Sequence, residues 1–344
     1  MKPPLDLRGL PKAELHLHLE GSIEPATAVQ LAARHGAAIS EKEVAARYAP
    51  GDFAGFLEAF KWVTSFLRAP EDYALVATRL AQSLVRQNVL YAEVTLSIGV
   101  MLRRDQDPLA NFTAIRNAAS EVPGIRFAWI FDAVRQFGPQ AAMEAARIAA
   151  SAQKEGVVAF GLGGDELALP AADFRRVYEF AAAQGLHRLV HAGEIGGAEQ
   201  VREAVELLGA ERIGHGIAAM HSERTMEDLA ARGVTLEVCP TSNLRTGALA
   251  RQLGKSEARA SEHPLGLFLR RGLSVTLGSD DPAMFDTTLA GEYELAQGMG
   301  LSPAELMTLA EAGFSASFLP EADLIGLLRS FQERSTAAGA QDLV

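Results

Sequence analysis

The stretch Lys12-Ala13-Glu14-Leu15-His16-Leu17-His18-Leu19-Glu20-Gly21-Ser22 contains two histidines that alternate with leucines. In an extended strand, residues two apart point to the same face, roughly 7 Å apart along the chain, so both histidines face one side and the leucines face the other. Imidazole suits zinc, which it binds at about 2.0–2.1 Å. The stretch therefore predicts a strand whose residues His16 and His18 form half of a metal site. A His-x-His pair also occurs in strands without a metal, so candidate ligands downstream must decide.

Length and composition narrow the class of protein. The chain has 344 residues, a formal net charge of −11 and 48% hydrophobic residues, which is typical of a globular protein with a sizeable core. The acidic balance and the absence of a Lys/Arg cluster argue against a nucleic-acid-binding surface. Cys239 is the single cysteine, which excludes an intrachain disulfide and a Cys-rich zinc module. No apolar run has the ~20 residues of a membrane span, and the N-terminus lacks the apolar run of a signal peptide, so we expect a cytoplasmic protein with no membrane partner.

Strand-like and helix-like stretches alternate along the chain. After the first strand, residues 24–35 have helical periodicity, and residues 52–88 predict further helices ahead of the second strand. The remaining strands are expected near residues 90–96, 125–131, 157–160, 186–190, 212–213, 234–238 and 274–277. Later helices are expected near residues 108–119, 139–155, 171–184, 198–208, 223–232 and 264–271, after Thr287, and near 303–312 and 321–332. Eight such units predict an α/β fold, a (β/α)8 TIM barrel in one domain over residues 1–344, with extra helices inserted after the first unit and at the C-terminus.

In a barrel of this kind, catalytic residues lie at the C-terminal ends of the strands. Polar residues mark the predicted ends of four strands: His16 and His18 in the first, His191 and Glu194 in the fifth, His215 in the sixth, and Asp280 and Asp281 in the eighth. Any one of these histidines could be a buried residue satisfied by a hydrogen bond. Four of them at one rim, together with the aspartate pair, predict a functional site.

Two other strand ends carry polar or glycine-rich segments. Gly161-Leu162-Gly163-Gly164-Asp165-Glu166 would let backbone amides approach a flat ligand, and it lacks the Gly-Lys-Ser/Thr ending of a phosphate loop. Glu237-Val238-Cys239-Pro240-Thr241-Ser242-Asn243 is expected to brace the site residues from behind.

Five segments, in chain order, together resemble the adenosine/adenine deaminase family of the amidohydrolase superfamily: Glu14 to Gly21, His191 to Glu194, Gly214 to Gly216, Cys239 to Asn243 and Ser279 to Pro282. The match spans nearly the whole chain. The resemblance implies hydrolytic removal of the 6-amino group of a small-molecule purine nucleoside. It also implies one zinc ion (Zn2+) per chain, held by His16, His18, His191 and Asp280.

The resemblance further implies a role for each remaining site residue: a proton to purine N1 from Glu194, orientation and deprotonation of the zinc-bound water by His215, contacts to N7 from Asp281 and to N3 from the amide of Gly164, and substrate binding by Glu20. These roles agree with general chemistry, because zinc lowers the pKa of its water toward 7 and histidine is a common general base. Purine N7 only accepts hydrogen bonds, so Asp281 must share or carry a proton, which a neighbouring carboxylate favours. No lysine lies at the end of strand four or five, so the carboxylated lysine of binuclear relatives has no candidate here.

Two departures from the family pattern bear on the substrate. Many members that act on adenosine carry Asp where this chain has Glu20, whose length is similar to that in adenine deaminases and in deaminases of 6-amino-6-deoxyfutalosine. The family's Asp-Leu-Ala-Gly-Asp-Glu reads Gly-Leu-Gly-Gly-Asp-Glu at residues 161–166. Neither position is a metal ligand or the proton donor implied by the resemblance, so the deamination chemistry is expected to persist.

Several functions are compatible with these residues. The leading one is deamination of a nucleoside, either 6-amino-6-deoxyfutalosine or adenosine, and the first alternative is an adenine deaminase acting on the free base. A non-catalytic nucleoside-binding protein would have no need of Glu194 or His215, and a different hydrolase on this fold would have no need of the pair Glu194 and Asp281. The motifs of cytidine-type zinc deaminases are absent.

The inserted helices and their neighbours favour a nucleoside over free adenine. Phe56, Phe60 and Trp62 either pack inward or cover a pocket, and with Ser97 they would offer aromatic and polar contacts beyond the base. A carboxylate-bearing group on the sugar, as in 6-amino-6-deoxyfutalosine, would need a cation. The candidates, each of which could equally be a solvated surface charge, are Arg135, Arg103 and Lys61.

Overall fold

The computed structural model describes residues 5–49 and 51–335. Within these residues, eight parallel strands pair in chain order to form one sheet. They are β1 (Lys12–His18), β2 (Val89–Leu96), β3 (Arg126–Val134), β4 (Val157–Gly163), β5 (His187–Ala192), β6 (Arg212–His215), β7 (Thr235–Val238) and β8 (Val275–Leu277). Most residues of these strands are buried, because helices cover the outer face of the sheet and side chains fill its interior.

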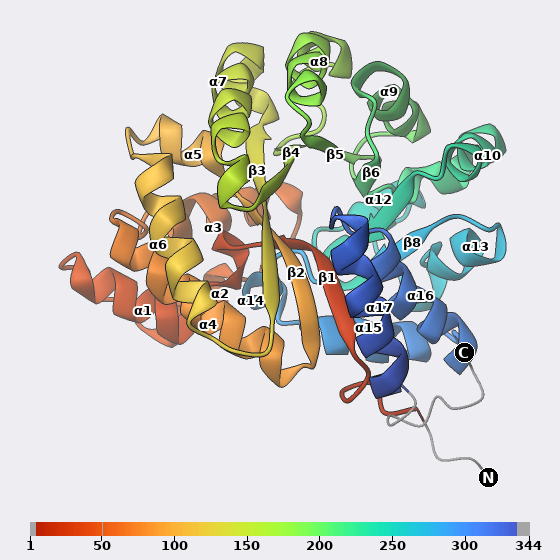
Figure 1. Cartoon of the computed structure of the whole chain (residues 1–344), viewed down its shortest axis with the longest axis horizontal. Helices are drawn as coiled ribbons and strands as arrows, with labels where there is room; N and C mark the ends of the chain where they lie inside the picture. The colour runs from red at the N-terminus through yellow and green to blue at the C-terminus, as the bar shows by residue number, and fades with distance from the viewer. Residues whose placement is uncertain (1–4, 50, 336–344) are drawn as a thin grey trace.

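The sheet closes on itself between β1 and the segment after β8. The amide of Asp280 donates to the carbonyl of His16, and the amide of His18 donates to the carbonyl of Asp280, both at 2.9 Å. These bonds place Asp280 beside the two histidines of β1 before any side chain is considered. The predicted (β/α)8 barrel with its eight strands is confirmed (Figure 1).

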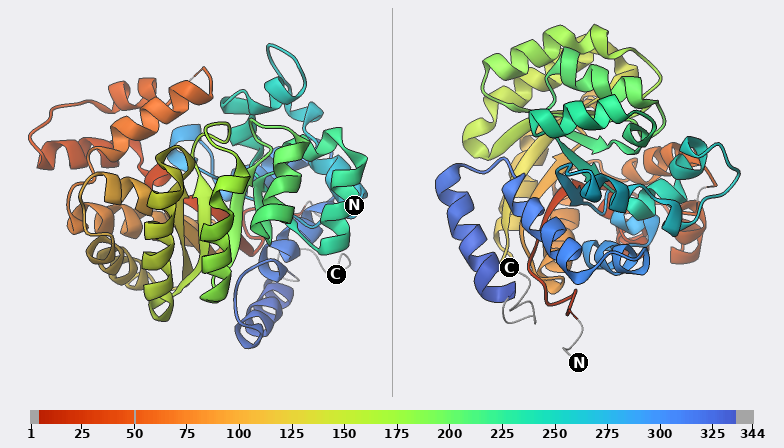
Figure 2. Two further views of the ribbon diagram at one scale, coloured as in Figure 1. Left: turned by 90° about the horizontal axis from the view of Figure 1, so that it is seen from above. Right: turned by 90° about the vertical axis from the view of Figure 1, so that its right-hand side faces the viewer.

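Seventeen α-helices surround the strands in the described part of the chain. They are α1 (Pro25–Arg34), α2 (Glu41–Arg47), α3 (Phe53–Thr64), α4 (Pro70–Arg86), α5 (Ile98–Arg103), α6 (Pro108–Ser120), α7 (Gly138–Ser151), α8 (Arg175–Ala183), α9 (Ala198–Leu208), α10 (Glu223–Arg232), α11 (Pro240–Arg245), α12 (Ala248–Gln252), α13 (Leu265–Arg270), α14 (Pro282–Phe285), α15 (Leu289–Gly298), α16 (Pro303–Ser315) and α17 (Glu321–Ser335). As predicted, extra helices precede β2 and follow the last unit. The red to orange helices of the insertion lie toward one end of the barrel in the left view of Figure 2.

Helix boundaries follow local sequence signals. Ser302 caps α16 by accepting from the amide of Glu305, whose carboxylate accepts from the amide of Ser302 in return. Asp52 caps α3 in the same way at the amide of Gly55. Helix α16 packs directly on β1, because Gly313 brings its backbone close to the carbonyl of Ala13.

Two strands are longer than the sequence predicted, and one side chain explains both. Strand β3 continues through Asp132 to Val134, and β4 continues through the glycine run to Gly163. The carboxylate of Asp132 lies against β4, where a Cβ on Gly161 would be 2.6 Å from Oδ1 and a Cβ on Gly163 would be 2.7 Å from Oδ2. The fourth strand, expected near residues 157–160, therefore extends to Gly163, because the glycines at 161 and 163 are strand residues that leave room for a buried carboxylate.

A buried ion cluster lies inside the barrel behind the site residues. Arg212 pairs with Glu93 at 2.5 Å and with Glu237 at 2.6 Å, and its guanidinium lies 3.7 Å from the ring centroid of Phe318. Burying charges is costly unless they are paired, so the three side chains depend on one another. Within residues 5–49 and 51–335, no helix has both the length and the apolar character required to cross a membrane.

Candidate metal centre and active site

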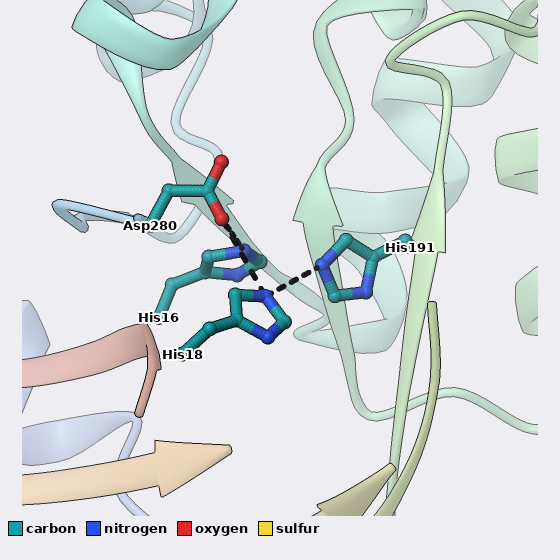
Figure 3. Close-up of side chains that lie close together, drawn as sticks. All are labelled: His16, His18, His191 and Asp280. Atoms are coloured by element: carbon teal, nitrogen blue, oxygen red, sulfur yellow. Dashed lines mark hydrogen bonds and ion pairs between the residues drawn. The ribbon is translucent and has the colours of Figure 1, made fainter. Parts of the chain in front are cut away.

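Four side chains converge at the C-terminal end of the barrel. His16 and His18 come from β1, His191 from β5 and Asp280 from the turn after β8, and one ligand atom from each lies within 4.8 Å of all the others. Figure 3 shows the three imidazoles and the carboxylate pointing toward a common centre. His16, His18 and Asp280 are buried, and His191 is partly exposed to the cavity.

These atoms are close enough together for one metal ion to contact all four. Four ligands about 2.05 Å from one zinc would lie about 3.3–3.4 Å from one another. The Nε2 atoms of His18 and His191 are 3.3 Å apart, and Oδ1 of Asp280 lies 3.4 Å from Nε2 of His16 and 3.5 Å from Nε2 of His18. Nε2 of His16 has no hydrogen-bond partner. Burial lowers the pKa of His18 to about 4 and that of His191 well below its usual range, so both are neutral imidazoles, the form that binds metal.

Glycines and one unusual backbone conformation make this convergence possible. A Cβ on Gly214 would lie 2.8 Å from Cε1 of His16, and a Cβ on Gly278 would lie 2.6 Å from Cβ of His16. Asp280 adopts a left-handed conformation with φ of 61°, which non-glycine residues rarely occupy and which commonly marks functional sites. The turn therefore brings Asp280 toward the histidines at a cost in backbone strain.

Glu237 of β7 orients one of the histidines. Its Oε2 lies 2.7 Å from Nδ1 of His16, and both side chains are almost completely buried. A carboxylate behind a histidine fixes the ring so that Nε2 is left for a metal. The expectation that residues 237–243 brace the site from behind is met at Glu237, and its link to Arg212 ties the cluster to the barrel interior.

Glu194 lies beside this cluster, on a loop that another carboxylate anchors. Glu166 accepts hydrogen bonds from the backbone amides of four consecutive residues, Gly193 to Gly196. Burial, reinforced by Asp280, raises the pKa of Glu194 well above its usual range. A raised pKa favours the protonated carboxyl of Glu194, the form that can donate a proton into the cavity.

His215 ends β6 next to the same two carboxylates. Its Nε2 lies 3.6 Å from Oε2 of Glu194 and 3.9 Å from Oδ2 of Asp280, and its Nδ1 lies 3.1 Å from Nδ2 of Asn243. Like Asp280, it has a left-handed backbone, with φ of 62°. Nε2 of His215 therefore lies beside both Glu194 and the Asp280 end of the cluster.

Asp281 is buried between the metal cluster and the loop after β1. A Cβ on Gly21 would lie 1.8 Å from its Oδ1, so glycine is required there. Burial and the adjacent Asp280 raise the pKa of Asp281 well above its usual range. Strand β8 ends at Leu277 and Asp280 is left-handed, and with this backbone both Asp280 and Asp281 line the cavity.

A cavity of about 240 Å³ opens above these groups. Its floor contains the cluster with Glu194, His215 and Asp281, and Gly164, also expected at the substrate, lies in its wall. The opposite wall is apolar and is formed largely by α3 and the segment after β3, through Phe53, Phe56, Leu57, Phe60 and Phe137. Lys61 and Ser97 also line it. The insertion thus covers the pocket.

Some residues singled out from the sequence lie elsewhere. Glu20 is buried behind the wall, where its carboxylate accepts from the amide of Ser97, so any effect on the substrate would act through that backbone. Trp62 faces away and packs against Arg47. Arg135 is buried and bonds to two backbone carbonyls, and Arg103 lies over the ring of Phe137. Of the three candidate cations, Lys61 is the one that lines the cavity.

Sequence reasoning missed several residues that shape the site. Asp132 and Gln136 line the cavity from the end of β3, which the predicted strand did not reach. Glu166 was inside a quoted segment, but its contact with the loop after β5 could not be read from the chain. His263, which contacts Asn243, had no local signal at all beyond being a histidine before a proline.

Comparison with known proteins agrees with this geometry. A closed (β/α)8 barrel with a histidine and aspartate cluster at the C-terminal rim defines a hydrolase of the metal-dependent amidohydrolase type. Residues 11–333 match the family model described as adenosine deaminase. The chain belongs to the adenosine deaminase family, and it is a hydrolytic deaminase.

Individual relatives carry two different names. The chain is 40% identical over 343 residues to an aminodeoxyfutalosine deaminase of Streptomyces coelicolor, covering 97% of this chain and 86% of the relative. It is 36% identical to an adenine deaminase of Chelativorans sp. strain BNC1, covering 90% and 94%. Among solved structures, an adenine deaminase from Arthrobacter aurescens superposes with a TM-score of 0.87 at 30% identity, covering 94% and 98%. An amidohydrolase from Burkholderia ambifaria with bound Zn gives a TM-score of 0.88 at 26% identity, covering 97% and 93%.

The anchoring of the Glu194 loop gives a first prediction. Glu166→Gln replaces one acceptor oxygen by an NH2 group that faces backbone N–H donors, so the loop loses its anchor and Glu194 is displaced. Displacement of a catalytic group by about 1 Å can cost about 100-fold in rate. We expect kcat to fall by about that factor while metal content is retained, as measured by steady-state assay and metal analysis. Asp165→Asn is the control, because Asp165 is half-buried in the same segment and its side chain accepts from the amide of Leu167, not from the Glu194 loop. A normal kcat in Glu166→Gln would contradict the anchoring role.

Proposed function

We propose that the protein is a zinc-dependent aminohydrolase whose substrate is 6-amino-6-deoxyfutalosine. The observation that carries this proposal is the shape of the cavity. The cavity of about 240 Å³ combines proposed zinc ligands, two carboxyl groups and a histidine with the aromatic side chains of α3. Free adenine would need no such wall. A relative with the corresponding name aligns over 97% of the chain, which supports the same choice.

The choice of zinc rests on the ligand set. Three imidazoles and one carboxylate suit zinc better than magnesium or calcium, which prefer oxygen ligands. A similar structure contains Zn, which supports the choice. When bound, the ion lowers the pKa of a coordinated water toward 7 and so makes a nucleophile available at neutral pH.

The chain's own residues then act on the purine. Glu194, which is protonated, donates to N1 and makes C6 more electrophilic. Asp281, which is also protonated, donates to N7 and orients the ring, and the amide of Gly164 faces N3. His215 orients the attacking oxygen toward C6. Addition at C6 and loss of ammonia replace the amino group by oxygen, with the net consumption of one water. Of the two protons of that water, one leaves with the ammonia and the other restores the proton that Glu194 gave to N1.

The metal stoichiometry follows from the single cluster. We expect one zinc per chain, measured by elemental analysis of protein purified without added metal. His18→Ala removes a ligand and should abolish both zinc binding and activity, whereas His221→Ala, at the exposed end of the turn after β6, should keep both. Two equivalents of metal, or none in an active sample, would be incompatible with this assignment.

The proton donor can be tested separately from the metal. Glu194→Gln keeps the shape and a hydrogen-bond donor, but an amide cannot transfer its proton to N1. General acid catalysis is typically worth about 10²–10⁴-fold, so kcat should fall by that range while zinc stays bound. Glu199→Gln, at an exposed position on α9, should leave both values unchanged. A near-normal kcat for Glu194→Gln would reject its assignment as the acid.

The substrate is decided by a panel of purines. We expect kcat/KM, measured by ammonia release, to be highest for 6-amino-6-deoxyfutalosine, then for adenosine and 2'-deoxyadenosine, and lowest for adenine. Lys61 is exposed and pairs with Glu58, so its contact with a substrate carboxylate is worth at most about 1 kcal/mol. Lys61→Met should therefore raise KM a few-fold for the carboxylated nucleoside and leave adenosine unaffected. A kcat/KM for adenine that equals or exceeds that of every nucleoside would favour the adenine deaminase alternative.

A further inference from the structure

A chain of buried hydrogen bonds reaches His215 from the backbone at the start of α13. The amide of Leu265 donates to Nδ1 of His263 at 3.1 Å. Nε2 of His263 lies 3.2 Å from Oδ1 of Asn243, and Nδ2 of Asn243 lies 3.1 Å from Nδ1 of His215. All three side chains are buried, so water does not compete with these contacts. We call His263, Asn243 and His215 with these hydrogen bonds the relay; it links the turn before α13, α11 and β6.

The backbone amide of Leu265 determines which nitrogen carries the proton in each histidine of the relay. A backbone N–H can only donate, so Nδ1 of His263 must accept and its proton must be on Nε2. That N–H requires an acceptor, which fixes the oxygen of Asn243 toward His263 and its NH2 group toward His215. Nδ1 of His215 then accepts, and the proton of neutral His215 is on Nε2.

The opposite tautomer, with the proton of His215 on Nδ1, would place two N–H donors against each other at the amide of Leu265. A proton on Nδ1 of His215 would require the oxygen of Asn243 to face it, and the NH2 group would then face Nε2 of His263. His263 would carry its proton on Nδ1, directly opposed to the amide of Leu265. A doubly protonated His263 meets the same clash, and burial moreover lowers its pKa to about 3.

We propose that Asn243 and His263 are positioning residues that hold His215 with its proton on Nε2, so that His215 presents a hydrogen-bond donor to the attacking oxygen. This inference rests on the proposed function for the identity of that oxygen. It changes the role predicted from the sequence, because Nε2 in this form has no lone pair with which to take a proton from water. The N–H of His215 points between Glu194 and Asp280, whose oxygens lie 3.6 and 3.9 Å away.

The tautomer can be read directly by 15N NMR of histidine-labelled, zinc-loaded protein without substrate. The His215 signal, assigned by its loss in His215→Asn, should show protonation at Nε2. Asn243→Asp has the same shape but offers only acceptors, so it should move the proton of His215 to Nδ1. Asn111→Asp, the same change at a buried asparagine on α6, should leave the His215 signal unchanged. Protonation at Nδ1 in the unmodified protein would overturn the inference.

Kinetics distinguish positioning from a purely structural role. His263→Ala frees Asn243 to rotate, and it should lower kcat by about 10- to 100-fold, the usual cost of losing an outer partner in such sites, with KM and zinc content near their normal values. His263→Gln supplies an amide N–H to Asn243 and should restore most of kcat and the Nε2 proton. Equal losses in both variants, or a normal kcat in His263→Ala, would contradict the relay. Failure of the unmodified protein to deaminate any purine would instead refute the proposed function, because the NMR result needs no turnover.

Discussion

The contact between Glu237 and His16 links the histidine and aspartate cluster at the rim of the barrel to the ion cluster inside the barrel. On one side, His16 belongs to the cluster at the rim, and on the other, Glu237 pairs with Arg212, which also pairs with Glu93. None of these side chains reaches water, so each charge is tolerable only because the next one compensates it. The orientation of the His16 imidazole is therefore set by an ion cluster that also holds β2, β6 and β7 together.

Burial also assigns the protonation states on which the chemistry depends. Burial and the charge of Asp280 raise the pKa of two carboxyl groups in the cavity, Glu194 and Asp281. The pKa of Asp280 itself is lowered, because its histidine neighbours outweigh the effect of burial. These surroundings therefore favour the ionised form of one carboxyl group and the protonated form of the other two. The arrangement separates roles among three chemically similar groups by environment alone.

The extent to which sequence predicted this structure depends on the range of each interaction. The strand period of His16 and His18 and the alternation of strands and helices are local, so the barrel and its catalytic rim could be read from the chain. Asp280 and His191 required the additional rule that strand ends meet at one rim. The anchoring of the Glu194 loop by Glu166 depends on how two loops approach in space, and the pairing of Asp132 with the glycines of β4 depends on strand register. Neither has a periodic or compositional signal.

The cavity divides into two parts with different constraints, and this division explains how one family contains enzymes for different purines. Around the floor, Gly21, Gly214 and Gly278 leave no space for a larger residue, and the backbone at Asp280 is strained, so substitutions there would displace the metal cluster. The wall on α3 belongs to an insertion outside the strand–helix alternation, and it touches the segment after Asp281 through Phe56, whose ring centroid lies 5.0 Å from that of Phe285 in α14. Changes at Phe53 and Phe60, on the same helix, would alter the space beside the base while that contact is kept. Substrate preference can therefore vary on a helix while the chemistry stays fixed by the barrel.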